Sequence, residues 1–283
     1  MNSIQRKYMG YISSVGIYVD VANIAMNGGY GMRYDVLREY ASHDSAEAIR
    51  LNAYVAFDSE RAKEDPSYRE RTNNFYDTLR DLGYKVIQKN VKRYIDEEGK
   101  VFVKANSDLD MAVDALMQSD ALTRMLLVTG DGDFLQVVRA LQSKGCRVEV
   151  LAFDNVSAEL RREVDVFMSG YLVPNLLPVK SSVDEWGHIP SSVRGCCYEF
   201  KHDRGFGFMR YLLNIQKNLW VTDTRRGDSP YETAYFHASN VEANVNFDIS
   251  ELPDRNILFE FDIYRSTRTE GIEAKNIRMI SRL

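Results

Sequence analysis

The sequence predicts a parallel α/β sheet flanked by helices, followed by a smaller all-β domain. From residue 15 to residue 173, apolar segments of strand length alternate with segments of helical periodicity, which is typical of a parallel sheet with helices on both faces. Three prolines and several serines occur in 174–194, as in an interdomain linker. From residue 195 the pattern changes to short strands interrupted by glycines. We therefore expect an α/β domain at 1–173, a linker at 174–194 and an all-β domain at 195–283.

Length, charge and cysteine usage narrow the functional classes. The 283 residues are enough for two domains with cores of their own. The formal net charge is −5, so charge alone does not indicate a nucleic-acid partner. The three cysteines show no metal-binding or disulfide spacing, which points to a reducing compartment. We expect a cytoplasmic protein without a membrane partner, because no apolar run could span a bilayer and the first residues lack the apolar core of a secretion signal.

The elements of the first domain follow from apolar runs and periodicity. Buried strands are expected at 15–21, 49–57, 84–88, 125–128 and 147–153, and helices at 34–40, 68–82, 109–117, 134–145 and 157–167. A charged loop is expected at 58–66, and a hairpin or lid at 91–103. The apolar positions of helix 109–117 form one face, made of Leu109, Ala112, Val113 and Leu116.

Acidic side chains fall where strands end. Asp20 interrupts an apolar segment, and a buried carboxylate is costly unless it is paired, hydrogen-bonded or bound to a metal. Asp131 and Asp133 follow the strand at 125–128, and Asp108 begins a helix, where the helix dipole favours an anion. These acids can converge on one edge of a parallel sheet, where carboxylates without histidine or cysteine suit Mg²⁺ or Mn²⁺. Two interpretations of the turn stay open: a metal site acting on phosphates, or a solvated turn in which Asp133 caps the next helix.

Basic residues gather around the expected hairpin. They are Lys85, Lys89, Lys92, Arg93, Lys100 and Lys104. The cluster is either a solvated basic loop or a set of contacts to phosphates, for which we single out Lys92, Arg93 and Lys104.

Three segments carry a family resemblance. Residues 17–23 (Ile-Tyr-Val-Asp-Val-Ala-Asn), 104–114 (Lys-Ala-Asn-Ser-Asp-Leu-Asp-Met-Ala-Val-Asp) and 129–134 (Thr-Gly-Asp-Gly-Asp-Phe) resemble the signature segments of the NYN branch of PIN-like nucleases. Members of that family are typically metal-dependent ribonucleases, and the resemblance implies a PIN-like, Rossmann-like sheet. It also implies a metal site made of Asp20, Asp108, Asp131 and Asp133, with Asn23 fixing Asp20 or the substrate. Asn106 and Ser107 replace the family's frequent Gly-Val, and Asp114 matches a frequent family acid.

Aromatic side chains alternate along two strands of the second domain. Phe206 and Phe208 lie on one face of a strand, and Tyr235 and His237 on one face of a later strand. Exposed aromatic side chains on adjacent strands stack unpaired bases. The same rings could instead fill the core of a small barrel, and the pattern leaves both interpretations open.

This second half resembles the cold-shock domain, a five-stranded OB-type barrel. Segments 204–209 and 235–237 match the two nucleic-acid motifs of that family, and Gly195 matches the glycine of its first strand. Glu199 replaces a stacking tryptophan and Ala238 replaces an aromatic residue. Residues 210–233 include an insertion that contains Trp220, Arg225 and Arg226. The resemblance implies an OB fold whose binding is weaker or shifted to the insertion.

Together these features predict a metal-dependent endoribonuclease that cleaves single-stranded RNA. Water activated by Mg²⁺ or Mn²⁺ would attack the phosphodiester, and the second domain would hold the RNA by stacking. Two alternatives stay open: a non-catalytic RNA-binding adaptor, and a phosphohydrolase that acts on nucleotides. The sequence leaves the oligomeric state open, a homodimer included.

Overall fold

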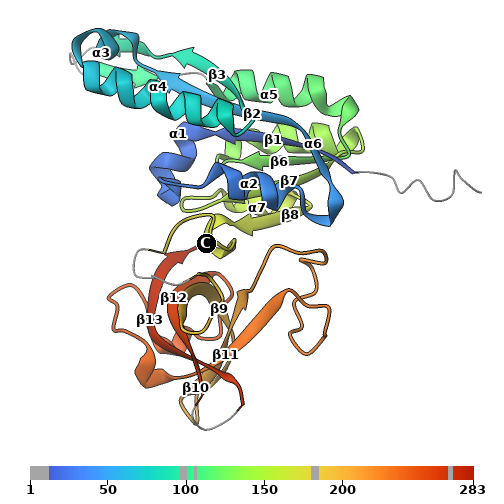
Figure 1. Ribbon diagram of the computed structural model, residues 1–283, viewed down its shortest axis with the longest axis vertical. Coiled ribbons are helices and arrows are strands. Elements are labelled where there is room, and N and C mark those ends of the chain that lie inside the picture. Colours follow the sequence, from blue (N-terminus) through green and yellow to red (C-terminus); the bar gives the residue numbers. More distant parts are fainter. Residues whose placement is uncertain (1–12, 96–100, 105–106, 180–184, 267–269) are drawn as a thin grey trace, which may run out of the picture. The chain divides into compact units, whose positions relative to one another are not determined.

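A computed structural model describes residues 13–95, 101–104, 107–179, 185–266 and 270–283. It contains a parallel six-stranded sheet flanked by helices and a closed five-stranded barrel (Figure 1), which confirms the predicted fold class. The chain divides into two compact units. One comprises the segment that ends at Met26 together with Ala41–Leu151 and Ser157–Phe167, and the other comprises Asn27–Tyr40, Ala152–Val156 and Met168–Leu283.

The sheet has the strand order β3-β2-β1-β6-β7-β8. Its strands are β1 (Ser14–Asp20), β2 (Glu47–Phe57), β3 (Lys85–Asn90), β6 (Arg124–Val128), β7 (Arg147–Ala152) and β8 (Val166–Ser169). The pairs β1–β2, β2–β3, β1–β6 and β6–β7 are all parallel. The expected hairpin is present as β4 (Lys92–Ile95) and β5 (Val101–Lys104), which pair antiparallel. Because β1 and β6 are parallel neighbours, the residues that follow them emerge at the same edge.

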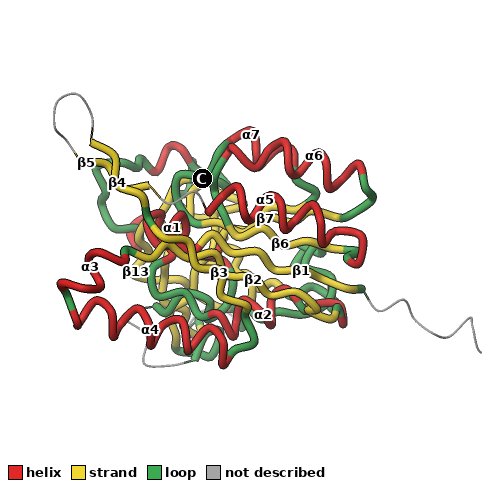
Figure 2. Tube along the Cα trace, turned by 90° about the horizontal axis from the view of Figure 1, so that it is seen from above, coloured by secondary structure: helices red, strands yellow, loops and turns green. Residues whose placement is uncertain are grey.

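Helices cover both faces of the sheet, with α5, α6 and α7 on one side and α4 on the other (Figure 2). The helices are α1 (Val21–Ile24), α2 (Tyr34–Ala41), α3 (Ser59–Glu64), α4 (Pro66–Asp81), α5 (Ser107–Gln118), α6 (Leu135–Ser143) and α7 (Ala158–Glu163). One core joins Tyr18 and Tyr54 of the sheet to Met111 of α5 and Val138 of α6. Within the described ranges, no helix combines the length and apolar character needed to cross a bilayer.

Two local expectations are wrong. The charged segment 58–66 contains the helix α3, which begins because the Asp58 side chain accepts a hydrogen bond from the Arg61 amide at 3.0 Å. Asp65 caps α4 in the same way, with Pro66 in its first turn. At 157–167 the helix α7 stops at Glu163 and the chain continues into the edge strand β8.

The buried face of α5 agrees only in part with the one expected from its apolar positions, because Ala112 and Leu116 are partly buried and pack against the core. Leu109 is 59% exposed and Val113 is 45% exposed, whereas Met111 and Ala115 are fully buried. The helix is turned so that an acidic side chain meets the sheet: Asp114 accepts a hydrogen bond from the Tyr54 hydroxyl at 2.8 Å. The buried residues Met111 and Ala115 and this polar contact therefore hold α5 in an orientation that leaves Leu109 and Val113 outside the core.

The second compact unit contains an OB-like barrel. Its strands are β9 (Ser191–Lys201), β10 (Phe206–Leu212), β11 (Tyr231–His237), β12 (Ile257–Arg265) and β13 (Ile272–Arg282). They close in the order β10-β11-β13-β12-β9, with β11 and β13 parallel and the other described pairs antiparallel. Trp186, which lies in the segment expected as a linker, is only 7% exposed and belongs to the barrel core, where its indole N–H donates to the Leu212 carbonyl at 2.8 Å.

We expect Gly195→Ala to destabilise the barrel by about 1–3 kcal/mol, because a Cβ on Gly195 would overlap the backbone carbonyl of Arg210 on β10. A backbone atom cannot rotate away as a flexible side chain can. Gly227→Ala is the matched control, since nothing lies within 4 Å of the Cβ that it would add. Denaturant unfolding of both variants measures the difference, and equal midpoints would contradict the close approach of β9 and β10.

Candidate active site and nucleic-acid interface

Asp20 sits at the junction of β1 and α1. Its side chain caps α1 by accepting a hydrogen bond from the Asn23 amide at 3.0 Å. An aspartate that follows a strand is suited to this position because its short side chain reaches the free amides of the next helix. The residue is only 4% exposed, so the fold holds a carboxyl group at the end of a buried strand.

Asn23 links two neighbouring strand ends. Its side-chain oxygen accepts a hydrogen bond from the Gly130 amide at 3.0 Å. Gly130 follows β6, which pairs with β1, so this bond joins the two segments that carry the predicted acids. The expected role of Asn23, to fix Asp20 or the substrate, stays a prediction.

Asp131 is the capping residue of the turn after β6. Its carboxylate accepts a hydrogen bond from the Asp133 amide at 2.9 Å, and its own amide donates to the Thr129 hydroxyl at 3.2 Å. The alternative interpretation, in which Asp133 caps the next helix, is wrong, because the chain first forms a 3₁₀ turn at Gly132–Phe134 with Asp131 as its cap. Asp133 is exposed.

Three of the predicted acids influence one another. The pKa of Asp20 is raised to about 6, mainly by burial and also by the negative charges of Asp108 and Asp131, while the hydrogen bond from the Asn23 amide opposes the rise. Asp108 also shares a side-chain hydrogen bond with Asp20. It lies in the first turn of α5, as expected. The structure therefore brings Asp20, Asp108 and Asp131 together at the carboxyl edge of the sheet.

The donor chemistry of this acid cluster (Asp20, Asp108 and Asp131) fits a hard divalent cation. Carboxylate oxygens are the ligands that Mg²⁺ and Mn²⁺ prefer. A cation would offset both the burial of the Asp20 carboxylate and its repulsion by Asp108 and Asp131, which together raise the pKa of Asp20. In the part of the chain that the structure describes, no three Asp, Glu, His or Cys side chains are already arranged to hold an ion.

The neighbouring acids of α5 have protein partners. Asp110 forms an ion pair with Lys89 at 2.6 Å, and Asp114 is bonded to Tyr54. Both acids and one lysine of the predicted basic cluster therefore already have partners within the protein. Lys92, Arg93 and Lys104 lie on β4 and β5, and their side chains fall outside the described residues.

We expect Asp20→Asn to raise the free energy of unfolding of the metal-free protein by about 2–3 kcal/mol above pH 6. The reason is that the pKa of Asp20 is about 6 in the folded state, so ionising this side chain at higher pH costs stability. The unfolded chain ionises at a lower pH, so wild-type stability falls as pH rises toward 6 and stays low above it. Asparagine removes this penalty and keeps the cap. The advantage should shrink below pH 6 and vanish near pH 4.

Thermal unfolding in a chelator across this pH range measures the effect of Asp20→Asn. The control is Asp120→Asn, whose side chain is 82% exposed and pairs with Lys144 at the surface. A loss of stability in Asp20→Asn at pH 8 would contradict the electrostatic strain that we assign to Asp20.

Aromatic side chains gather on the outer face of the barrel. Phe206 pairs in register with His237, and Phe208 with Tyr235. The ring centroids of Phe206 and Tyr235 are 5.6 Å apart, and those of Phe208 and Tyr235 are 6.0 Å apart. The core is filled by other residues, including Met209, Phe236 and Phe259. The alternative that these rings fill the core is therefore wrong.

Tyr198 also belongs to this surface, although the sequence pattern did not single it out. The pairing of β9 with β10 shifts by one residue between Phe208 and Met209, as in a β-bulge. Cys197 and Phe200 are both buried, so the two residues between them face outward, and the Tyr198 ring lies 6.3 Å from that of Phe208. The outer aromatic surface thus consists of Tyr198, Phe206, Phe208, Tyr235 and His237.

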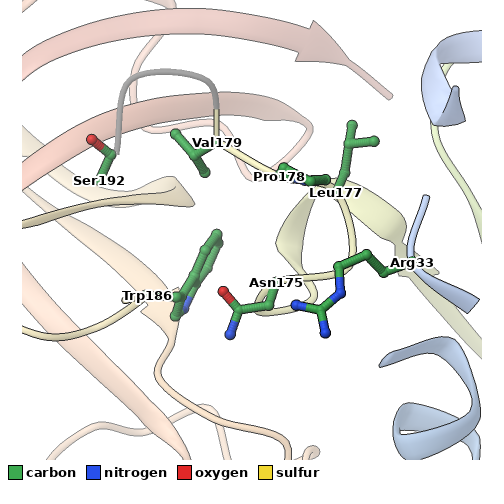
Figure 3. A pocket seen from close by; sticks show the side chains of 7 residues that line it. All are labelled: Arg33, Asn175, Leu177, Pro178, Val179, Trp186 and Ser192. Atoms are coloured by element: carbon green, nitrogen blue, oxygen red, sulfur yellow. The ribbon is translucent and has the colours of Figure 1, made fainter. Parts of the chain in front are cut away.

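A separate cavity of about 160 Å³ lies in the second compact unit (Figure 3). It is lined by Arg33, Asn175, Leu177, Pro178, Val179, Trp186 and Ser192. The Arg33 guanidinium is already paired with Asp35 at 2.6 Å. None of the predicted site residues lines this cavity, so we assign no chemistry to it.

Comparison with known proteins bears on the first domain. Residues 14–176 match the family described as NYN domain. The low amplitude and bright protein LabA of Synechococcus elongatus is 27% identical over 163 residues, which cover 55% of this chain and 83% of LabA. A solved protein of unknown function from Vibrio parahaemolyticus is 26% identical, with a TM-score of 0.44, over 56% of this chain and 92% of its own.

Proposed function

Because the chain belongs to the NYN domain family, we propose that it is a metal-dependent endoribonuclease that cleaves single-stranded RNA. The observation that carries the proposal is the acid cluster at the carboxyl edge of the sheet. Burial and the charges of Asp108 and Asp131 raise the pKa of Asp20 to about 6. A cation bound there would attract all three carboxylates and so outweigh their mutual repulsion.

In this proposal the acid cluster holds Mg²⁺ or Mn²⁺, with Asp133 contributing from the exposed side. A bound cation would supply an activated water and neutralise charge on the scissile phosphate. The chain orients its acids through backbone amides: that of Asn23 donates to Asp20, and that of Asp133 donates to Asp131. These two hydrogen bonds restrict the orientations of the Asp20 and Asp131 carboxylates.

The barrel would hold the RNA on the outer aromatic surface, where unpaired bases stack on the rings. The exposure of Tyr235 supports this stacking role, because its large aromatic side chain is 37% exposed. Lys92, Arg93 and Lys104 would contact phosphates from the hairpin.

Cleavage of end-labelled single-stranded RNA and DNA with Mg²⁺, Mn²⁺ or a chelator tests this function. We expect internal cuts in RNA that require added metal. Cleavage that persists in chelator, or that appears equally in a mock purification, would argue against it. RNA binding without turnover on any substrate would indicate an adaptor, and preferred release of nucleosides from mononucleotides would indicate a phosphohydrolase.

Metal binding has a readout that needs no substrate. Mg²⁺ or Mn²⁺ should raise the melting temperature of the wild-type protein, because a ligand that binds only the folded state stabilises it. The rise should be much smaller in Asp20→Asn, which lacks one of the proposed ligands.

A further inference from the structure

An exposed tryptophan stands on the loop 213–230 between β10 and β11. Trp220 is 70% exposed, whereas Trp186, the other tryptophan of the chain, is 7% exposed. The Arg226 guanidinium lies 6.0 Å from the centre of the Trp220 ring. An indole of this size in water forgoes the free energy of burial, so covering it with a ligand would be favourable.

The backbone on both sides of Trp220 is fixed. The Leu219 carbonyl accepts a hydrogen bond from the Tyr231 hydroxyl at 2.8 Å. Val221 is only 3% exposed, and its carbonyl accepts a hydrogen bond from the Ser229 hydroxyl at 2.8 Å. The loop therefore exposes the indole to solvent while the residues on both sides of it are held in place, which lowers the conformational entropy lost on binding.

The same loop adjoins the outer aromatic surface. Arg210, on the outer face of β10, donates to the Thr222 carbonyl at 3.3 Å. Its guanidinium lies 5.7 Å from the Tyr198 ring centre and 5.6 Å from that of Tyr231. A second contact joins the hydroxyls of Thr224 and Thr233, which are 2.7 Å apart. A surface of aromatic rings and arginines thus continues from β9 and β10 onto the loop.

We propose that Trp220 and Arg226 form an additional stacking subsite for one unpaired base of the single-stranded RNA held by the barrel. This inference rests on the proposed function. An indole face stacks any base, and an arginine beside it can contact the adjoining phosphate. Arg226 pairs with Asp228 at 2.7 Å, but both side chains are about half exposed, and such a surface pair is weak enough to exchange for a phosphate.

Tryptophan fluorescence tests the subsite directly, because Trp220 is exposed and Trp186 is shielded. In a chelator, single-stranded RNA of about 12 nucleotides, within the range that an OB fold covers, should quench the emission of the wild-type protein. Trp220→Phe should lose the quenching, since only the buried Trp186 then emits.

Affinity provides the second measurement, read by the anisotropy of the same labelled RNA. Trp220→Ala should weaken binding about 5- to 150-fold, the equivalent of one stacked base. Trp220→Phe should recover most of the affinity because phenylalanine keeps a flat face. Val245→Ala, which removes a fully exposed apolar side chain elsewhere in the barrel, should bind like the wild type.

The outcomes separate this inference from the function on which it rests. If RNA binds with unchanged affinity to Trp220→Ala, or binds without quenching Trp220, the subsite is refuted while the proposed function stands, and Trp220 becomes a candidate contact for a protein. If neither the wild-type protein nor any variant binds RNA, both the proposed function and the subsite are refuted.

Discussion

Asp131→Asn is expected to lower the cleavage rate at saturating RNA about 100-fold or more, since a metal ligand contributes several kcal/mol to the reaction. Asparagine keeps an oxygen that can accept the hydrogen bond from the Asp133 amide, so the turn should stay folded. What it removes is the negative charge beside Asp20 and Asp108. Affinity for RNA should change by less than about twofold, because stacking in the barrel supplies binding.

Single-turnover cleavage of labelled RNA, with anisotropy in chelator for affinity, measures both quantities for Asp131→Asn. Asp120→Asn is the matched control, because it makes the same chemical change at a carboxylate that is 82% exposed. Wild-type cleavage by Asp131→Asn would remove Asp131 from the chemistry. An equal loss in Asp120→Asn would show that the effect is not specific to the acid cluster.

The acid cluster was predictable because of the geometry of parallel strands. Asp20 follows β1 and Asp131 follows β6, and paired parallel strands end at one edge of the sheet. Asp108 was predictable for a different reason, since an aspartate in the first turn of a helix is favoured by the dipole. The metal-ligand role of these residues stays a prediction.

Features that depend on a shift of one residue could not be predicted. The bulge in β9 turns Tyr198 outward, but an extra residue in one strand leaves no periodic signal in the sequence. The choice of Asp131 over Asp133 as the cap depends on whether the first turn is 3₁₀ or α-helical, and both residues favour capping.

The orientation of α5 shows the limit of apolar periodicity. Leu109 and Val113 belong to the expected apolar face, yet both residues are exposed, whereas Ala112 and Leu116 of the same face pack against the core. Tyr54 and Asp114 form a hydrogen bond between the sheet and the helix. A polar contact between residues distant in sequence cannot be recognised from the pattern of either segment alone.

Replacing both Phe206 and Phe208 by alanine is expected to weaken RNA binding at least about 30-fold, since each stacked base contributes about 1–3 kcal/mol. The two rings contact each other, with centroids 6.1 Å apart, so their effects should not add exactly as independent terms. Anisotropy of labelled RNA in chelator measures the affinity of the double variant and of both single variants.

The kinetic consequence of this double variant distinguishes holding the RNA from cutting it. If the barrel only holds the RNA, KM should rise by about the loss in affinity while the rate at saturation changes less than about threefold. The core residue Phe236 is fully buried and untouched, so the melting temperature of the barrel should stay close to that of the wild type. Val245→Ala serves as the surface control, because its side chain is fully exposed on the same domain. A fall in the saturated rate with KM unchanged would contradict this role. It would mean that the aromatic surface contributes to the chemical step and not only to holding the RNA.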